Sequence, residues 1–390
     1  MKKYSRVVAR INLDAIEYNM DAMNSHTNSD TKMLNVIKAD GYGHGAVQIA
    51  HMMKDKEYLW GFAVATLDEA VVLRESGITN SILVLGCVFP DQFEDMFKYD
   101  ISMTVYNKEL FEPAAELAKS MNKKLKIHIK LDTGMGRLGF PPNDNSIEEI
   151  KEICNMDCVV NEGMFTHFAK ADEIDKSYTE NQLQKFEYMI KSLKNNDVLF
   201  SHYHASNSAG IIDIRDANYD LVRTGISCYG LYPSNEVDHE TIRLQPAMEL
   251  ISHIVSLKEF HKGQAISYGG TFVAEHDIKV ATIPVGYADG YPRSLSNKGY
   301  VLIRGKKARI LGRVCMDQFM VDVTEIPETV IFDKVVLVGK SEDETLPVEV
   351  LSEISDRFNY EFVCDISKRV PREYIRRNEV ISQSDYFKVV

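Results

Sequence analysis

The segment MLNVIKADGYGHGA, residues 33–46, joins an apolar run to a glycine-rich turn and places a lysine at the junction. The run MLNVIKA has the length and composition of a buried strand. A lysine amine near such a strand costs free energy unless it is paired, acts as a base or forms a covalent bond. Lys38 is therefore the first candidate functional residue.

Seven further apolar runs follow and alternate with stretches that carry helix signals. Thr66 and Glu69 form a capping box at the start of one helix that Gly77 can end. About eight strand–helix repeats in some 200 residues are typical of a (β/α)8 barrel of the TIM type, because each parallel strand needs a crossover helix. A doubly wound open sheet is the alternative. The seven runs are WGFAVAT (60–66), SILVLG (81–86), ISMTVY (101–106), LKIHIKLD (125–132), EGMFTHF (162–168), SHYHAS (201–206) and LVRTGISCYG (221–230).

A second domain is expected after the barrel. The polar connection SNEVDHETIRLQP (234–246) precedes strand-rich sequence, in which only PVEVLSEISDRF (347–358) looks helical. We therefore predict a barrel over residues 14–240 and a mostly antiparallel β domain over 241–390, which the opening strand 1–13 can join. The strand-rich segments are AISYGGTFVA (265–274), KVATIPVGYA (279–288), YVLIRGKKARILGRV (300–314), FMVDVT (319–324) and KVVLVG (334–339).

Composition excludes several classes of protein. A net charge of −12 opposes nucleic-acid binding, and no apolar run reaches the roughly 18 residues of a membrane span. The first residues do not resemble a signal peptide, so a cytoplasmic location is expected. The six cysteines are scattered, which predicts neither disulfides nor structural zinc. The pair His202 and His204 has no third ligand at useful spacing, so no metal is expected.

Candidate site residues gather where the barrel strands end, and in such barrels the active site lies at those carboxyl ends. An amine, guanidinium groups, imidazoles and a turn with backbone N–H groups suit an anionic ligand that also carries a carbonyl. Pyridoxal phosphate fits both demands, because its aldehyde condenses with a lysine and its phosphate can rest on the turn RTGIS (223–227). The strand-end residues are Lys38, Tyr42, Lys130, Asp132, Arg137, His167, His204, Asn207, Ser208, Arg223 and Gly225.

Nine motifs in order resemble those of alanine racemases over essentially the whole chain. The resemblance implies a pyridoxal-phosphate barrel with a C-terminal β domain, in a homodimer whose active sites take residues from both subunits. Thr224 departs from the family pattern, which commonly has proline there. The motifs are residues 35–46, KLDTGMGRLGF (130–140), FTHFA (165–169), SNSA (206–209), RTGISCYG (223–230), ISYGG (266–270), VGYADGY (285–291), GRVCMDQFMVDVT (312–324) and FNYE (358–361).

The resemblance also implies roles for four catalytic residues. Lys38 resembles the lysine that holds the cofactor as a Schiff base and acts as the base on the D-alanine side. Tyr268 resembles the opposite base on the L-alanine side, supplied by the partner subunit, and His167 resembles the group that orients it. Arg223 resembles the arginine that faces the pyridine nitrogen. Two bases suit racemisation, because a single base tends to return the proton to the face it left.

Further contacts follow from the same resemblance. Arg137 resembles the residue that meets both the cofactor and the substrate carboxylate, and Lys130 resembles a carbamylated lysine that holds this arginine. Taken alone, Lys130 could equally form an ion pair with Asp132. Met316 resembles a contact to the substrate carboxylate, and Tyr287 resembles part of the substrate entrance. The remaining cofactor-binding residues expected are Tyr42, Asn207, Ser208, Gly225, Ile226 and Tyr360.

The sequence thus predicts an enzyme that interconverts L- and D-alanine and supplies D-alanine for peptidoglycan. Racemisation of serine, lysine or another amino acid remains an alternative, because the sequence does not fix the size of the substrate pocket. A non-catalytic pyridoxal-phosphate carrier is a third possibility, although such a carrier would lack the β domain and Tyr268.

Overall fold

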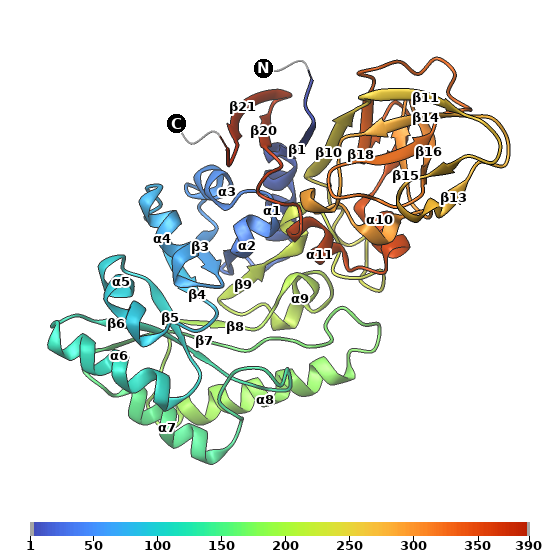
Figure 1. The fold of residues 1–390 in the computed structure, drawn as a ribbon. Coiled ribbons are helices and arrows are strands. Elements are labelled where there is room, and N and C mark those ends of the chain that lie inside the picture. The colour runs from blue at the N-terminus through green and yellow to red at the C-terminus, as the bar shows by residue number, and fades with distance from the viewer. Residues whose placement is uncertain (1–3, 388–390) are drawn as a thin grey trace. The chain divides into compact units, whose positions relative to one another are not determined.

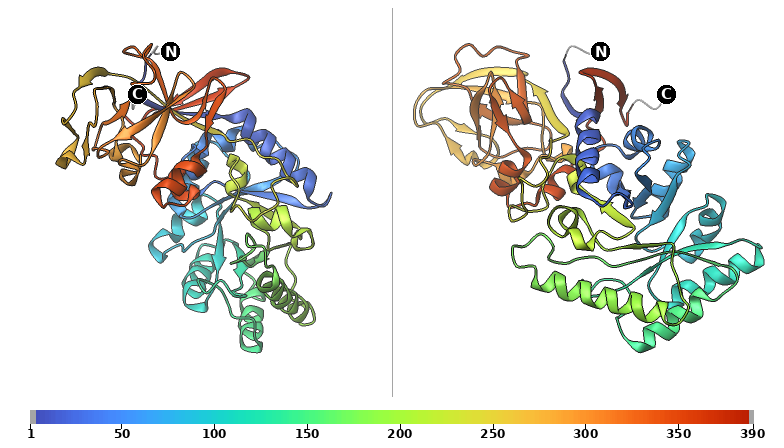
Figure 2. Two further views of the ribbon diagram at one scale, coloured as in Figure 1. Left: turned by 90° about the vertical axis from the view of Figure 1, so that its right-hand side faces the viewer. Right: turned by 180° about the vertical axis from the view of Figure 1, so that it is seen from behind.

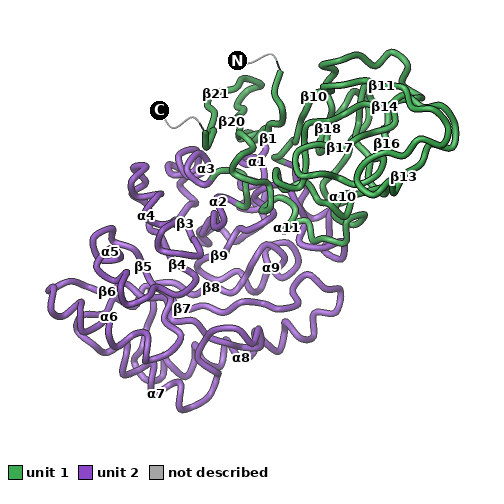
Figure 3. The backbone as a smooth tube through the Cα atoms, in the orientation of Figure 1, with its two compact units in different colours: residues 1–14, 42–45, 247–390 green, residues 15–41, 46–246 purple. Residues whose placement is uncertain are grey.

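The computed structural model describes residues 4–387, which fall into two compact units (Figure 3). One unit holds residues 15–41 and 46–246, and the other holds the described residues within 1–14, 42–45 and 247–390. The first three residues of the expected opening strand and the last three of the expected β domain lie outside the description. We call the two units the barrel unit and the β unit.

The barrel unit contains eight parallel strands in the order β8-β7-β6-β5-β4-β3-β2-β9 (Figure 1). At the seam between β8 and β9, the Arg223 N–H donates to the Ser206 carbonyl at 3.0 Å. The predicted barrel is confirmed, and the open sheet is excluded. The strands are β2 (Lys32–Val36), β3 (Leu59–Val64), β4 (Ser81–Val84), β5 (Ser102–Val105), β6 (Leu125–Lys130), β7 (Val159–Phe165), β8 (His202–His204) and β9 (Leu221–Thr224).

Helices separate the strands as the sequence signals predict. The capping box at Thr66 and Glu69 is formed at the start of α4. Helices α6, α7 and α8 lie outside the strands (Figures 1 and 2). No helix among residues 4–387 is long and apolar enough to cross a bilayer. The helices are α1 (Leu13–His26), α3 (Ala46–Met53), α4 (Leu67–Glu75), α5 (Phe93–Lys98), α6 (Lys108–Ser120), α7 (Asp144–Cys154), α8 (Ser177–Lys194) and α9 (Ser208–Asp213).

The β unit is built on one long sheet in the order β11-β14-β17-β16-β15-β18-β10-β1-β20-β21. The opening strand β1 pairs antiparallel with β10 and parallel with β20. Arg304 and Gly305 both have positive φ at the turn that joins β15 to β16 in a hairpin. The strands are β1 (Val7–Asn12), β10 (Met248–His253), β11 (Ser256–Phe260), β14 (Ile278–Ile283), β15 (Tyr300–Ile303), β16 (Lys306–Leu311), β17 (Phe319–Asp322), β18 (Lys334–Ser341), β19 (Glu344–Leu346), β20 (Arg372–Arg376) and β21 (Glu379–Ser384).

Two local predictions for the β unit were wrong. The expected single helix, α10 (Val348–Ser355), is followed by a second one, α11 (Asn359–Cys364), which is too short to show a helical period. The expected strand 265–274 is broken into β12 (Ala265–Ile266) and β13 (Phe272–Val273) by the short turn η4 (Tyr268–Gly270). Gly269 and Gly270 have positive φ there, a conformation that does not continue a strand.

Candidate active site

The carboxyl ends of the barrel strands bring together the residues that the sequence placed there. Lys38 follows β2, Lys130 ends β6, His167 follows β7 and His204 ends β8. The register aligns Lys130 with Phe165 and Phe165 with His204. These three side chains therefore lie at one level of the barrel.

Phe165 is a central contact that the sequence does not indicate, because an apolar residue in a strand usually belongs to the core. Its ring stacks on the His204 imidazole with centroids 4.6 Å apart. The Lys130 Nζ lies 5.0 Å from the same ring centre, and the Arg223 Cζ lies 5.5 Å from it. Phe165 thus gives the Arg223 guanidinium and the Lys130 amine an aromatic face in place of water.

Lys38 begins a turn of left-handed backbone, α2 (Lys38–Tyr42). The φ angles of Ala39, Asp40 and Tyr42 are 52°, 53° and 52°, and Gly41 is also positive. Left-handed backbone costs about 1–2 kcal/mol for each residue other than glycine. Such a turn persists only where its surroundings hold it.

Hydrogen bonds to two carboxylates hold this turn. The Ala39 N–H donates to Glu69 Oε1 at 2.6 Å, and the Ala46 N–H donates to Asp40 Oδ1 at 2.8 Å. Glu69 Oε2 accepts the Ala65 N–H at 2.7 Å. Glu69 therefore joins the start of α4 to the backbone beside Lys38, a second task that its capping motif did not reveal.

Replacing Glu69 with alanine should lower the free energy of unfolding by about 2 kcal/mol, because the N–H groups of Ala39 and Ala65 lose an ionised acceptor. Urea unfolding of the wild-type chain and the variant measures this difference. Asp68→Ala, at an exposed site in the same helical turn, is the control and should change stability by about 0.5 kcal/mol. Equal losses in the two variants would contradict this role of Glu69.

Arg223 is the buried centre of the site, with only 3% of its surface exposed. Its Nη1 donates to His204 Nδ1 at 3.0 Å, and its Nη2 lies 3.2 Å from His167 Nδ1. Nη2 also donates to the carbonyls of Thr166 and Ala205, at 2.8 and 2.7 Å. Burial lowers the pKa of Arg223 to about 9, so the guanidinium stays protonated at neutral pH.

The guanidinium fixes the protons of both histidines, since it can donate hydrogen bonds but not accept them. His204 Nδ1 accepts an Nη1 proton, whereas His167 Nδ1 can only share an Nη2 proton that the carbonyls of Thr166 and Ala205 also accept. Neither Nδ1 can donate to the guanidinium, which leaves the single proton of each imidazole on Nε2. Burial, reinforced by the charge of Arg223, lowers the pKa of both histidines well below the ordinary value. Both imidazoles are therefore neutral at pH 7, and His167 Nε2–H remains available as a donor.

The two buried histidines predict that the folded chain becomes less stable as the pH is lowered. Each takes up a proton near pH 6.5 in the unfolded chain but stays neutral in the folded one, so protons favour unfolding below that pH. Between pH 6.5 and 5.5 the free energy of unfolding should fall by about 2 kcal/mol. Urea unfolding at both pH values measures this change. His167→Gln should remove about half of it. Stability that does not fall over this range would contradict the assignment.

Lys130 is buried beside two guanidinium groups. Its Nζ donates to the Leu131 carbonyl at 3.1 Å. Burial, together with the charges of Arg223 and Arg137, lowers its pKa well below the ordinary value, against the opposing charge of Asp132. Asp132 Oδ1 instead accepts the N–H groups of Gly134 and Gly136, and no ion pair joins it to Lys130 in the described chain. The amine is thus driven towards its neutral form.

The turn after β9 presents two backbone donors to one point. The N–H groups of Gly225 and Ser227 both donate to Ser208 Oγ, at 3.0 and 3.3 Å. Asn207 precedes this serine and caps α9, its Oδ1 accepting the Gly210 N–H at 3.0 Å. Converging N–H groups of this kind suit a phosphate, and buried Ile226 closes the turn.

The β unit carries five more of the residues that the sequence singled out, whereas Arg137 lies in the barrel unit. The rings of Tyr42 and Tyr360 lie 6.1 Å apart. Tyr268 is 71% exposed on the η4 turn, which excludes a packed strand position for it. Tyr287 and Met316 are also exposed. Two backbone hydrogen bonds join their segments: the Tyr287 N–H donates to the Cys315 carbonyl, and the Ala288 N–H donates to the Met316 carbonyl.

Comparisons with known proteins match nearly the whole chain. Residues 11–233 match the family model of the alanine racemase N-terminal domain, and residues 247–374 match that of the C-terminal domain. Alanine racemase 1 of Clostridium acetobutylicum is 42% identical over 97% of this chain and 98% of its own. The alanine racemase of Desulforamulus reducens is 44% identical over 94% of this chain and 98% of its own.

Solved structures agree with these matches. The alanine racemase of Clostridium difficile 630 superposes with a TM-score of 0.93 at 40% identity, covering 99% of this chain and all of that one. The crystal structure of alanine racemase from Bacillus anthracis with bound L-Ala-P has a TM-score of 0.93 at 34% identity, with both chains fully covered.

Proposed function

The chain belongs to the alanine racemase family, and from this premise we propose that it interconverts L-alanine and D-alanine with pyridoxal 5′-phosphate as its cofactor. The family consists of isomerases that depend on this cofactor. The observation that carries the proposal is the buried, protonated Arg223 at the strand ends that also hold Lys38. Its described partners are imidazoles and carbonyls, and no carboxylate among residues 4–387 pairs with it.

The donors at the barrel mouth fit this cofactor. Lys38 Nζ would bond to its aldehyde carbon, and the N–H groups of Gly225 and Ser227 with Ser208 would hold its phosphate, next to Asn207 and Ile226. Arg223 would face the ring nitrogen as a cation at neutral pH. The cofactor-binding roles of Tyr42 and Tyr360, like the substrate-binding roles of Arg137, Met316 and Tyr287, are proposed on the family resemblance.

When bound, pyridoxal phosphate withdraws electrons from the substrate α-carbon and makes its proton acidic. Lys38 would exchange that proton on the D-alanine side. A partner subunit would supply Tyr268 on the L-alanine side, and its high exposure in one chain fits a residue that completes a second chain. His167, with its proton on Nε2, is able to donate to a phenolate oxygen and so to stabilise the deprotonated tyrosine.

We also propose that Lys130 is carbamylated. A neutral amine attacks carbon dioxide, a nitrogen–carbon bond forms, and one proton passes to water. The low pKa of Lys130 supplies the neutral amine. The resulting carbamate anion would lie near the positive charges of Arg223 and Arg137 and would offset them. The uncharged amine of Lys130 cannot do so.

Rates of racemisation over a panel of alanine, serine, lysine and arginine test the substrate. Alanine should give the highest kcat/KM by at least about tenfold, since a pocket that excludes larger side chains is expected to discriminate by this much or more. A faster reaction with another member would assign a different racemase, and no reaction with any member would support a cofactor carrier. We place the enzyme in the cytoplasm, where its D-alanine would serve peptidoglycan synthesis.

A further inference from the structure

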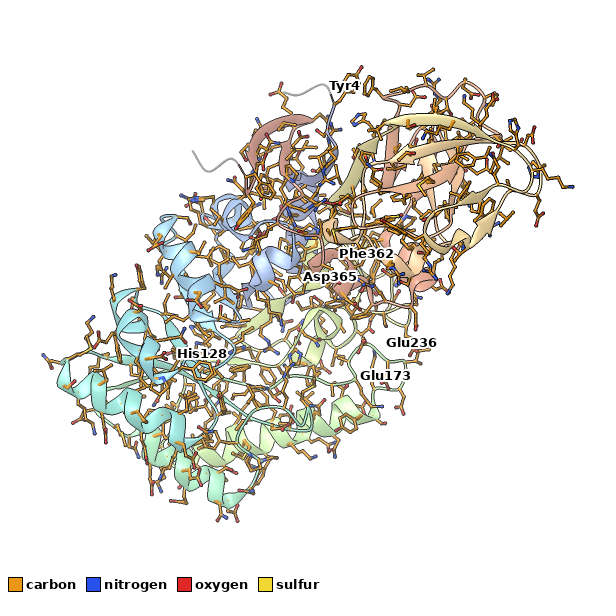
Figure 4. All side chains as sticks on the ribbon, viewed as in Figure 1. Tyr4, His128, Glu173, Glu236, Phe362 and Asp365 are labelled. Carbon is orange, nitrogen blue, oxygen red and sulfur yellow. The ribbon has the colours of Figure 1, made fainter. Side chains whose placement is uncertain are left out.

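A line of hydrogen bonds continues from Arg223 into the interior of the barrel. Arg223 Nη1 lies 3.0 Å from His204 Nδ1, and His204 Nε2 lies 3.0 Å from His128 Nδ1. His128 Nε2 lies 3.2 Å from Glu162 Oε2, which also accepts a hydrogen bond from the Ser102 hydroxyl. His128 is labelled among the strands of the barrel in Figure 4. The four side chains come from β9, β8, β6 and β7.

Both ends of this line impose the same direction on its protons. The guanidinium can only donate, so His204 Nδ1 accepts and His204 Nε2 carries the proton. That proton is donated to His128 Nδ1, which leaves the proton of His128 on Nε2. The carboxylate of Glu162 can only accept it. Each imidazole therefore carries its proton on Nε2. With these protons, every hydrogen bond between the Arg223 guanidinium and the Glu162 carboxylate has one donor and one acceptor.

The hydrogen-bonded groups are buried, so water cannot replace a partner that is lost. His128 and His204 are fully buried, and the Glu162 side chain is only 15% exposed. Burial alone would raise the pKa of the Glu162 carboxyl, but hydrogen bonds from His128 and Ser102 outweigh it and hold the pKa below its ordinary value. Glu162 therefore stays ionised and is the anion of the line.

The backbone makes room for the line. The pairing of β6 with β7 shifts register between Ile127 and His128, and this shift places His128 opposite Gly163. A side-chain carbon on Gly163 would lie 2.2 Å from His128 Nδ1. Glycine at position 163 is thus required by the imidazole of His128, next to the carboxylate that this imidazole meets.

We propose that Glu162 is a positioning residue for the racemisation: through His128 and His204 it holds the Arg223 guanidinium in a single orientation towards the cofactor ring nitrogen. The functional half of this inference rests on the proposed function. The physical reason is that removal of the Glu162 carboxylate leaves His128 Nε2–H buried without an acceptor. Reversing both histidines would satisfy that proton but would turn His204 Nδ1–H against a guanidinium donor, so Arg223 would lose its orientation.

The test compares Glu162→Leu, which removes the acceptor, with Glu162→Gln, which keeps an amide oxygen for His128. Asp213→Asn is the control, since Asp213 is a largely buried carboxylate that pairs with Lys176 elsewhere in the barrel unit. Nitrogen-15 spectra of labelled histidines report which ring nitrogen of His128 and His204 carries the proton, in protein with and without pyridoxal phosphate. Racemisation of alanine and exchange of its α-proton with deuterium are measured on the same samples.

In the wild-type chain and Glu162→Gln, both histidines should show protonated Nε2 only, and kcat/KM should agree within about threefold. Glu162→Leu should show a second tautomer of His128, and its kcat/KM should fall about 10- to 100-fold. Its α-proton exchange should slow on both L- and D-alanine, because Arg223 serves both faces. Asp213→Asn should leave tautomers and kinetics unchanged.

The proposal is overturned if Glu162→Leu keeps the wild-type tautomers, if its kcat/KM stays within twofold of wild type, or if the Asp213→Asn control loses as much activity. A wild-type chain that racemises no amino acid would instead refute the proposed function. The histidine spectra of the protein without cofactor would in that case still decide whether Glu162 sets the tautomers.

Discussion

Replacing Lys38 with alanine should reduce the rate of alanine racemisation by a factor of about 10⁴ or more, because the chain loses both the covalent attachment of the cofactor and one of its two bases. The wild-type protein with pyridoxal phosphate should show a visible absorption band, and borohydride should fix the cofactor to Lys38. Peptide mapping after reduction measures the position of this label, and the variant should carry none.

Lys32→Ala is the matched control for that experiment. Lys32 lies on the same strand, β2, but is exposed, and its Nζ donates to the Glu57 carbonyl at 3.2 Å. This variant should keep wild-type activity and labelling. A borohydride label at any lysine other than Lys38, or an active Lys38→Ala enzyme, would refute the assignment.

Replacing Tyr268 with phenylalanine should have the second largest effect, a loss of racemisation of about 10²- to 10⁴-fold, because one of two general bases disappears. In deuterium oxide the variant should still exchange the α-proton of D-alanine through Lys38, while exchange on L-alanine nearly stops. Mass spectrometry of each recovered enantiomer measures the two rates. Tyr188→Phe, at another exposed tyrosine, should leave both rates unchanged.

Equal slowing of exchange on the two enantiomers would show that Tyr268 does not serve one face. Mixing Lys38→Ala with Tyr268→Ala subunits tests the sharing of sites. A mixed dimer holds one complete site if each site takes Lys38 from one chain and Tyr268 from the other. Mixing under conditions of subunit exchange should restore part of the activity, and no recovery would mean that both bases belong to one chain.

The barrel and the residues at its strand ends could be predicted because they follow from local pattern. Apolar runs such as LKIHIKLD and the capping box at Thr66 report directly on strands and helices, and parallel strands place their ends at one face. The left-handed turn after Lys38 could not be predicted in this way. Alanine rarely adopts positive φ, and the Glu69 oxygen that accepts the Ala39 N–H lies on another helix.

The same limit explains the other misses. His128 in the run LKIHIKLD has the sequence environment of a core residue, and its contacts Glu162 and His204 lie on β7 and β8. Tyr268 sits in a run of β-branched, aromatic and small residues that reads as a strand, yet two glycines turn the backbone out of it. The surroundings of His128 and of Tyr268 depend on contacts between segments that are distant in the sequence, and the local periodicity of the sequence does not reveal such contacts.

The position of β1 in the β unit constrains how the polypeptide is assembled during translation. Val7 pairs with Ser252 and Ala9 with Arg372, so β1 is synthesised before the barrel but waits for partners that are synthesised after it. Until then its unpaired edge is open to association with other nascent chains. Anyone who expresses the β unit separately would need to graft residues 4–14 onto it, for instance by circular permutation, to fill the gap between β10 and β20.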